Sequence, residues 1–302
     1  MTVPVEGAVL PVDKPVGPTS HDIVQRARRV LRVRRVGHTG TLDPFASGLM
    51  LLCVGPATRL SEYLTGQDKE YLATARLGVS TDTLDREGQA VAESDAWRQV
   101  TLGAVEGALA TLRGTIEQRP PVFSAKKVQG EAAHRRSRRG EKVSLPAVRV
   151  VIHELELTEL ALPEIGFRVV CSSGTYIRSL ARDVGEALGV GAHLVALRRT
   201  RVGAHRVEDA VPGDFREPIP AGSWITPLDA LGGWTRLEVD EAEAARICHG
   251  QSLSTVGDGD PEGPAPGPVA LHFRGHLLSV AHVEGGVIRP EKVFPHALEA
   301  AS

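Results

Sequence analysis

The chain of 302 residues contains no asparagine, few aromatic residues and only three cysteines. Cys53, Cys171 and Cys248 are far apart and odd in number, so they fit neither a disulfide framework nor the spacing of zinc ligands. No apolar run is long enough to cross a bilayer, and the N-terminus lacks the basic and apolar pattern of a signal peptide. We therefore expect a cytoplasmic protein with free thiols and no membrane segment.

Sequence motifs for bound cofactors are also missing. There is no Walker A motif and no GxGxxG after a strand, so nucleotide cofactors have no support. The 11 histidines are scattered without ligand spacing, and neither a GxSxG motif nor a Cys/His arrangement indicates a nucleophilic serine or cysteine. We therefore expect an activity that needs no cofactor and no metal.

The small net charge of −2 hides an uneven distribution. Residues 1–209 hold 29 Lys and Arg against 24 Asp and Glu, whereas residues 210–302 hold 6 against 13. Of the 35 cations, 29 are arginine. Because guanidinium groups form paired hydrogen bonds with phosphate oxygens, this composition favours a phosphate-bearing partner for the larger, basic region.

One loop concentrates unusual chemistry. Residues 37–49 read GHTGTLDPFASGL and contain a single carboxylate, Asp43. An arginine run lies just before this loop and consists of Arg26, Arg28, Arg29, Arg32, Arg34 and Arg35. A lone carboxylate in a tight loop beside many cations suggests a catalytic acid presented to a polyanion. A simple Asp-Pro turn is the alternative explanation for Asp43.

The apolar pattern predicts intermixed strands and helices. Strands are expected at 9–12, 49–54, 71–77, 148–160 and 165–171, with another in the region 193–201. Helices are expected to begin at Thr19 or Ser20 and to cover 57–64, 102–112 and 176–188. The elements do not alternate as regular βαβ units, which favours an α+β fold with a mixed, mostly antiparallel sheet flanked by helices.

Composition suggests two domains, a large one over residues 1–233 and a small β-rich one over residues 234–302. Residues 211–233 are rich in Pro and Gly and are expected to form a linker. Residues 123–147 are basic with little to bury, and we predict that they form a mobile insertion in the large domain. Residues 257–268, GDGDPEGPAPGP, are expected to form a flexible loop.

At the level of whole motifs, the chain resembles a known family. The stretch GHTGTLDPFASGLM followed by VGPATRLSEYL is similar to the catalytic signature of the TruB family of tRNA pseudouridine synthases. Further similar motifs occur in order: VDKPVGPTSHDIV, DKEYLATARLG, RPPVFSAKKVQG and CSSGTYIRSLARDVGEALGVGAHLVALRRTRVG. The segments LEVDEAEAARICHGQSL and VEGGVIRPEKVFP resemble the PUA-type RNA-binding module of bacterial members.

The resemblance implies a tRNA pseudouridine(55) synthase that isomerises a uridine in the T-loop of tRNA. It implies a pseudouridine-synthase fold, base flipping, an essential aspartate and no cofactor. The expected partner is the T-arm stem-loop of tRNA, and we expect a monomer that works without a guide RNA. Two alternatives remain, a guide-RNA-dependent archaeal or eukaryotic relative and a non-catalytic protein that binds or folds tRNA.

The same resemblance implies residue roles. Asp43 matches the catalytic aspartate, Tyr71 the tyrosine that contacts the target base, and Arg178 the arginine that pairs with the aspartate. The expected substrate and RNA contacts are His38, Lys14, Lys127, Tyr176, Leu197, Arg135, Arg136, Arg138 and Arg139. His21 departs from the family pattern, in which we expect Asn in many members, and this puts one loop contact in doubt.

Overall fold

The computed structural model describes residues 3–123, 127–128, 131–132, 145–254 and 264–300. The chain forms two compact units. The first consists of Met1–Leu42, Leu49–Thr65 and Gly203–Ser302, and the second of Asp43–Gly48 and Gly66–Val202. Asp43, Tyr71 and Arg178 therefore belong to the same unit.

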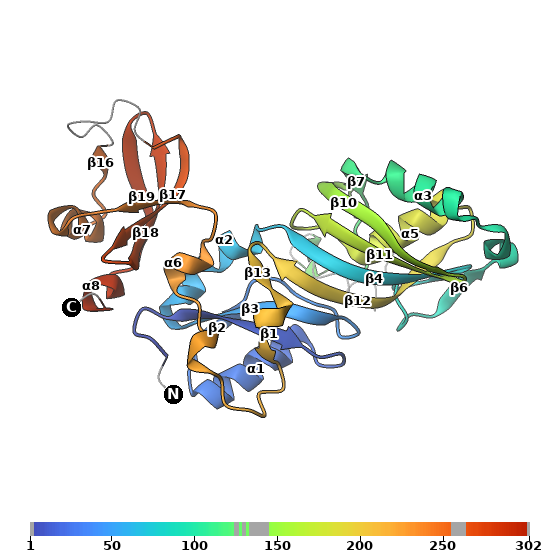
Figure 1. The fold of residues 1–302 in the computed structure, drawn as a ribbon, viewed down its shortest axis with the longest axis horizontal. Coiled ribbons are helices and arrows are strands. Elements are labelled where there is room, and N and C mark those ends of the chain that lie inside the picture. Colours follow the sequence, from blue (N-terminus) through green and yellow to red (C-terminus); the bar gives the residue numbers. More distant parts are fainter. Residues whose placement is uncertain (1–2, 124–126, 129–130, 133–144, 255–263, 301–302) are drawn as a thin grey trace. The chain divides into compact units, whose positions relative to one another are not determined.

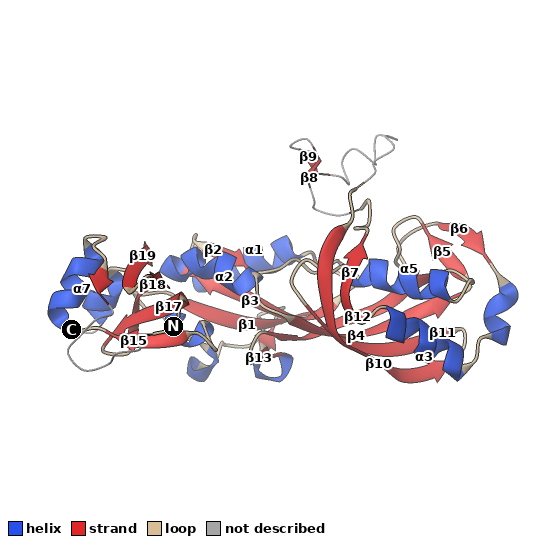
Figure 2. Ribbon diagram, turned by 90° about the horizontal axis from the view of Figure 1, so that it is seen from above, coloured by secondary structure: helices blue, strands red, loops and turns tan. Residues whose placement is uncertain are grey.

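A sheet in the order β12-β4-β11-β10-β7 forms the base of the second unit, and every neighbouring pair in it is antiparallel. Its strands are β4 (Lys69–Leu77), β7 (Gly114–Gln118), β10 (Val148–Ala161), β11 (Glu164–Cys171) and β12 (Ala192–Val202). Helices α3 (Leu102–Thr111) and α5 (Ile177–Ala187) pack on the sheet and on each other (Figures 1 and 2). The remaining elements are β5 (Val79–Thr81), β6 (Ala90–Glu93), η2 (Asp95–Gln99), β8 (Lys127–Val128) and β9 (Glu131–Ala132). The predicted α+β class is confirmed.

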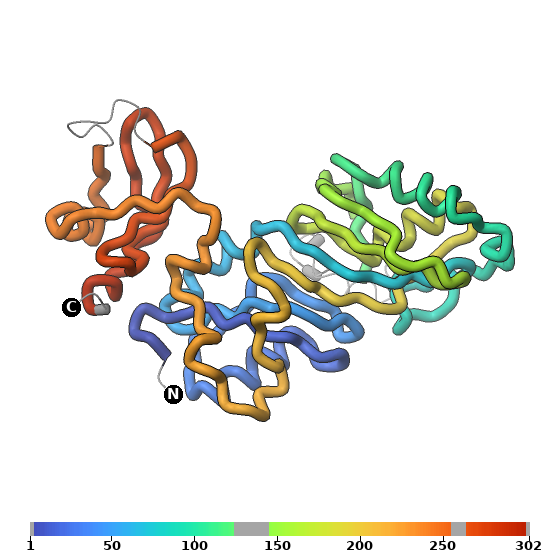
Figure 3. The backbone as a smooth tube through the Cα atoms, in the orientation of Figure 1, coloured from blue at the N-terminus to red at the C-terminus, as the bar shows by residue number. Residues whose placement is uncertain are grey.

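Strand β4 carries Tyr71 into the interior of this unit. Alternate residues from Tyr71 to Leu77 are buried, and those between them are more exposed, because successive side chains of a strand point to opposite faces. Tyr71 pairs with Val169 of β11 and with Arg199 of β12, and the three strands run side by side in Figure 3. Tyr71 thus occupies a buried position between two neighbouring strands.

Helix α5 carries Arg178 in its first turn. Its buried residues are Ile177, Arg178, Ser179, Leu180, Ala181, Val184 and Gly185. A side chain at Gly185 would place its Cβ 2.4 Å from the backbone nitrogen of Ala192, so only glycine allows the helix to approach the start of β12 this closely. The buried stripe includes a charge, and a buried charge requires partners.

In the first unit, β1 (Ala8–Lys14) pairs in parallel with β14 (Val211–Pro212), and β2 (Val36–His38) pairs antiparallel with β3 (Ser47–Val54). The other elements outside the C-terminal sheet are α1 (Ser20–Leu31), η1 (Gly55–Leu60), α2 (Ser61–Thr65), β13 (His205–Arg206), η3 (Val207–Asp209), η4 (Ala221–Ser223) and α6 (Pro227–Ala230). Strand β3 begins in the second unit, where Ser47 and Gly48 pair in parallel with β12.

Helix α1 begins with a capping box. The Thr19 hydroxyl accepts from the backbone N–H of Asp22, and the Asp22 carboxylate accepts from the backbone N–H of Thr19. This confirms the start predicted from the sequence. Val30 is 51% exposed, although its spacing predicts a buried position, because the last turn of the helix is not covered there.

The C-terminal part of the first unit is a five-stranded sheet in the order β15-β17-β18-β19-β16. Its elements are β15 (Thr235–Glu238), α7 (Glu241–Cys248), β16 (Leu253–Ser254), β17 (Gly267–Phe273), β18 (His276–Glu284), β19 (Val287–Val293) and α8 (His296–Ala300). Its core includes Val239, Ile247, Leu271, Leu278 and Ile288. The β-rich character predicted for this region is confirmed.

One prediction about local structure is wrong. Residues 211–233 do not form a simple linker, because β14 pairs with β1 and Leu228 and Ala230 of α6 are buried. The short helix expected over 57–64 is present, as a 3₁₀-helix, η1, followed by the short α2. Composition alone does not distinguish a Pro- and Gly-rich linker from a packed segment with many turns. Most of the loop expected at 257–268 lies outside the described residues.

Gly48 provides a test of the close approach between β3 and β12. Its φ of +107° suits glycine, and a Cβ there would lie 2.2 Å from the carbonyl oxygen of Arg199. We expect Gly48→Ala to lower the free energy of unfolding in urea by at least about 2 kcal/mol, because backbone atoms would have to move. Gly103→Ala is the matched control, since a Cβ there meets nothing within 4 Å. Equal stability of the two variants would contradict the close approach of β3 and β12.

Candidate active site

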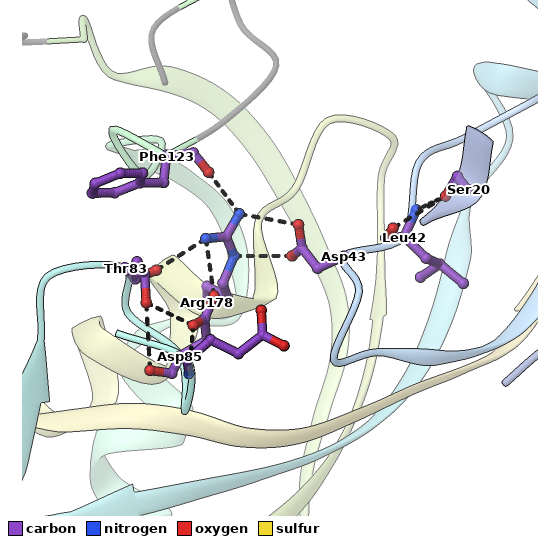
Figure 4. Close-up of polar contacts among 8 residues, drawn as sticks. Ser20, Leu42, Asp43, Thr83, Asp85, Phe123 and Arg178 are labelled. Atoms are coloured by element: carbon purple, nitrogen blue, oxygen red, sulfur yellow. Dashed lines mark hydrogen bonds and ion pairs between the residues drawn. The ribbon is translucent and has the colours of Figure 1, made fainter. Parts of the chain in front are cut away.

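The loop that carries Asp43 is fixed on both sides of this residue. Before it, the backbone N–H of Leu42 donates to the hydroxyl of Ser20 at 2.8 Å, and this hydroxyl donates to the carbonyl of Leu42 at 3.1 Å (Figure 4). After it, Phe45 is buried, and the N–H of Ala46 donates to the carbonyl of Asp43 at 3.1 Å. Asp43 therefore occupies a tight turn, as the Asp-Pro sequence indicates.

The side chain of Asp43 is paired with the guanidinium of Arg178. Arg178 Nε lies 2.9 Å from Asp43 Oδ2, and Arg178 Nη2 donates to Asp43 Oδ1 at 3.3 Å. Two parallel contacts of this kind fix the plane of the carboxylate as well as its charge. The Asp43 side chain is 34% exposed and that of Arg178 only 7%. The carboxylate thus remains accessible while the arginine beside it is buried.

Every N–H group of the Arg178 guanidinium has a partner. Besides Asp43, Nη1 lies 3.2 Å from Asp85 Oδ2 and donates to the carbonyl of Thr83 at 2.9 Å. Nη2 also donates to the carbonyl of Phe123 at 2.8 Å. Since a guanidinium has five N–H donors, this set satisfies all of them. Figure 4 shows these contacts around Arg178. A change in the orientation of the guanidinium would break several of them.

The second carboxylate, Asp85, was not predicted as a site residue. Its side chain is 6% exposed, and Oδ1 accepts from the Thr83 hydroxyl at 2.6 Å and from the backbone N–H of Glu87 at 3.0 Å. Asp85 contacts Arg178 but not Asp43, so we describe it as a positioning residue. The polar sequence TDTLDREG indicates a turn, and nothing in it indicates that one of its aspartates is buried.

Tyr71 is buried in the same unit as Asp43. Burial raises the pKa of the Tyr71 hydroxyl, while the charge of Arg199 opposes this shift. The phenol is therefore neutral at physiological pH. It can form a flat wall and donate a hydrogen bond, but a role as base would require that another group remove its proton.

Two further cations are buried near Tyr71 and were not predicted. Lys69 is 6% exposed and Arg199 is 2% exposed. Burial, together with the charge of Arg199, lowers the pKa of Lys69 to about 8. Lys69 lies two positions before Tyr71 on β4, so both side chains point to the same face of the strand. The alternation of β4 could therefore have indicated a lysine on the buried face. With Arg178, three buried lysine and arginine side chains lie in the described part of this unit.

Tyr176 and Leu197 lie in the same unit. Tyr176 directly precedes α5, and its backbone exchanges two hydrogen bonds with the Gln118 side chain, at 2.9 and 3.1 Å. This anchor holds the first turn of α5 and hence Arg178. Leu197 is 8% exposed on β12 and pairs with Ala73 of β4. The substrate contacts that we expect from Tyr176 and Leu197 stay predictions.

The other predicted contacts lie elsewhere. His38 accepts from the N–H of Gly40 through Nδ1 at 3.3 Å, and Lys14 is fully buried and donates to the carbonyl of Pro15 at 3.0 Å. Both belong to the first unit. Lys127 lies in the short β8, whose backbone alone is described. Arg135, Arg136, Arg138 and Arg139 lie outside the described residues, so their role in RNA binding stays a prediction.

Neither a metal-binding cluster nor a membrane-spanning helix is found among the described residues. Within residues 3–123, 127–128, 131–132, 145–254 and 264–300, no group of three or more His, Cys, Asp or Glu side chains could hold a metal ion. In the same part of the chain, no helix is long and apolar enough to cross a membrane.

Comparison with known proteins gives consistent matches over the whole chain. Residues 28–177 match the N-terminal domain of the TruB family of pseudouridylate synthases, and residues 178–213 match a C-terminal domain of tRNA pseudouridylate synthase B. A tRNA pseudouridine synthase B from Burkholderia lata is 44% identical over 94% of this chain and 89% of its own length. One from Thermobifida fusca is 44% identical over 96% of this chain and 98% of its own length.

Solved structures agree in fold. A chain in the structure of an H/ACA RNP bound to a substrate RNA containing 2'-deoxyuridine is 25% identical, with a TM-score of 0.72, covering 96% of this chain and 86% of its own. A chain of a Cbf5-Nop10-Gar1 complex gives the same identity and TM-score, covering 96% of this chain and 85% of its own. The chain therefore belongs to the TruB family of pseudouridylate synthases.

Proposed function

We propose that this protein converts the uridine at position 55, in the T-loop of tRNA, into pseudouridine. The main support is the pairing of the accessible Asp43 carboxylate with the buried and fully bonded Arg178. The names of the relatives from Burkholderia lata and Thermobifida fusca support tRNA as the substrate. Position 55 and the T-loop rest on the family resemblance of the sequence motifs.

The reaction is an isomerisation. The bond between C1' of the ribose and N1 of uracil breaks, the base rotates, and C1' forms a new bond to C5. The proton on C5 is lost and N1 gains one, so atoms and electrons balance without an oxidant or reductant. This balance explains why no cofactor is expected.

Asp43 carries the chemistry in this proposal. An ionised carboxylate can add to the base or to C1' of the ribose, or it can act as a base. The guanidinium of Arg178, 2.9 Å away, favours the ionised form of the carboxylate. Asp85 neutralises the other side of Arg178 and keeps the guanidinium in place.

The target base must leave its stack to reach Asp43. Tyr71 offers a flat surface in the same unit as the carboxylate, and Leu197 an apolar one on a neighbouring strand. We propose that these two side chains hold the flipped uracil. His38 would occupy or stabilise the gap left in the RNA.

Binding of the RNA involves two further regions in this proposal. The basic segment 123–147 would contact the phosphates of the T-arm, which position the substrate without specifying its sequence. The β-rich region 234–302 would act as a PUA-type RNA-binding module. We also propose that the protein works as a monomer without a guide RNA, since its motifs resemble those of bacterial members.

The test of this proposal is the position of the product. We expect a tRNA transcript incubated with the protein to contain pseudouridine at position 55, mapped by chemical derivatisation of pseudouridine and primer extension. A transcript with cytidine at position 55 serves as the control and should contain none. Pseudouridine elsewhere, with position 55 unmodified, would contradict the proposed specificity, and binding without modification would favour the non-catalytic alternative.

The basic segment gives a separate prediction. Replacing Arg135, Arg136, Arg138 and Arg139 by Gln should weaken tRNA binding and flatten its salt dependence. Each lost phosphate contact lowers the slope of log K against log salt by roughly 0.7 to 0.9. Turnover at saturating RNA should change far less. Unchanged affinity with a collapsed maximal rate would show that the segment shapes the active site instead.

We also expect that activity survives chelation. EDTA treatment and dialysis of the protein alone should leave pseudouridine formation unchanged, because the proposed isomerisation has no step that requires a metal. The substrate is a T-arm stem-loop folded in monovalent salt, so that chelation does not act through the RNA. Loss of activity that an added divalent metal restores would contradict the cofactor-free reaction.

A further inference from the structure

The arginine run before the catalytic loop has no role in the proposed chemistry. In the structure it forms a distinct surface at the C-terminal end of α1, the dark blue helix in Figure 1. Arg28, Arg29, Arg32 and Arg34, together with Val33, line an open, shallow depression of about 430 Å³. We call these four arginines the α1 arginine surface.

The charges of this surface are not used in ion pairs within the described part of the chain. None of the four arginines has an ion pair with a described Asp or Glu at 4.0 Å or less. Arg28 donates to the carbonyl of Val36 at 2.8 Å, and Arg29 to that of Gln25 at 3.4 Å. Arg29, Arg32 and Arg34 are exposed. The surface therefore presents concentrated positive charge to solvent.

Stabilisation of the helix accounts for only part of this charge. Cations in the last turn interact favourably with the C-terminal end of a helix, which explains Arg28 and Arg29. Arg32 and Arg34 lie beyond the helix. Arg32 has φ 55° and ψ 32°, a left-handed conformation that glycine adopts without strain at this position. At Arg32 the backbone is strained because the residue is not glycine. We take this strain as an indication that the exposed guanidinium has a function.

The chain connects this surface to the reacting carboxylate. Arg34 and Asp43 are nine positions apart in the chain, so in any arrangement their Cα atoms lie within about 32 Å of each other. An RNA whose uridine lies at Asp43 therefore has backbone phosphates in the neighbourhood of the surface. Guanidinium groups at a concave, solvent-filled surface suit phosphate oxygens, which they bind in pairs of hydrogen bonds.

We propose that the α1 arginine surface binds backbone phosphates of the same RNA molecule whose uridine reacts at Asp43. The inference rests on the proposed function for the identity of that RNA. The chemistry that it requires is a run of phosphodiesters, and it requires no base contact.

The test compares two variants of the whole chain, each of which loses three arginine charges. Arg29→Gln, Arg32→Gln and Arg34→Gln together remove three exposed charges of the surface, while Arg28 is kept because it bonds the backbone. The control is Arg98→Gln, Arg149→Gln and Arg216→Gln, which removes the same charge from exposed arginines paired with Asp95, Glu117 and Asp214. Circular dichroism verifies the fold of both.

Affinity for an unmodified tRNA transcript is measured over a series of salt concentrations. We expect the first variant to lower the slope of log K against log salt by about 2 to 3 and to weaken binding at least tenfold at about 0.15 M salt. The control should bind like wild type. Equal slopes and affinities in the two variants would overturn the proposal. Wild-type protein that binds tRNA without modifying it would instead overturn the proposed function, while the comparison of slopes would still decide on the surface.

Discussion

Replacement of Asp43 by Asn should lower the rate of pseudouridine formation at least about a thousandfold, since loss of a reacting side chain typically costs this much or more. The amide has the shape of the carboxylate but cannot carry its negative charge. Folding should be retained, because Arg178 keeps Asp85 and its two backbone partners. Tritium release from tRNA labelled at C5 of uridine measures the rate, and binding of the same tRNA should change little.

Asp68→Asn is the matched control for this variant. Asp68 lies in the same unit, is 48% exposed and pairs only with His153 among the described ion pairs, so its loss removes an equal charge without touching Arg178. We expect its activity to stay near that of wild type. If Asp43→Asn retained activity within tenfold of wild type, Asp43 would not be the reacting carboxylate.

Replacement of Arg178 by Gln should damage both stability and activity. The Asp85 carboxylate, whose side chain is 6% exposed, would lose its counter-charge. The Asp43 carboxylate would lose the guanidinium that fixes its orientation. Removing one partner of a buried ion pair typically costs about 3 to 5 kcal/mol. We expect a loss of this size in the free energy of unfolding, measured with urea, and a rate close to that of Asp43→Asn.

Two companion variants separate the structural and catalytic consequences. Arg182→Gln, one turn further along α5, removes an arginine that pairs with Asp183 and Glu186 and should keep most of the stability and rate. Adding Asp85→Asn to Arg178→Gln removes the unpaired charge, so it should restore part of the stability but none of the activity. Recovery of activity in this double variant would show that Arg178 acts only by stabilising the fold.

The strands and helices around the site follow from local sequence patterns. The alternation in β4 specifies which face of the strand is buried, and this places Tyr71 inside the unit. The apolar spacing of α5 also predicts its buried face, but it does not predict that Arg178 is buried there. The capping box at Thr19 likewise marks the start of α1. These features depend on residues close together in the sequence.

The constellation around Arg178 could be predicted only in part. The pairing of Asp43 with Arg178 joins residues 135 positions apart, and it was expected from the family motifs rather than from any local pattern. Asp85 was missed because a buried aspartate in a polar turn has the same local sequence as a solvated one. Similarly, the burial of Leu228 could not be predicted, because the composition of its segment is typical of a linker.

Detection of pseudouridine in an isolated T-arm stem-loop tests the central claim most directly. The RNA is incubated with the purified chain alone, without nucleotide, metal or guide RNA, and is then digested to nucleosides and analysed by liquid chromatography. We predict one pseudouridine per stem-loop with wild-type protein and none with Asp43→Asn. A stem-loop that the wild-type protein binds but leaves entirely as uridine would contradict the account.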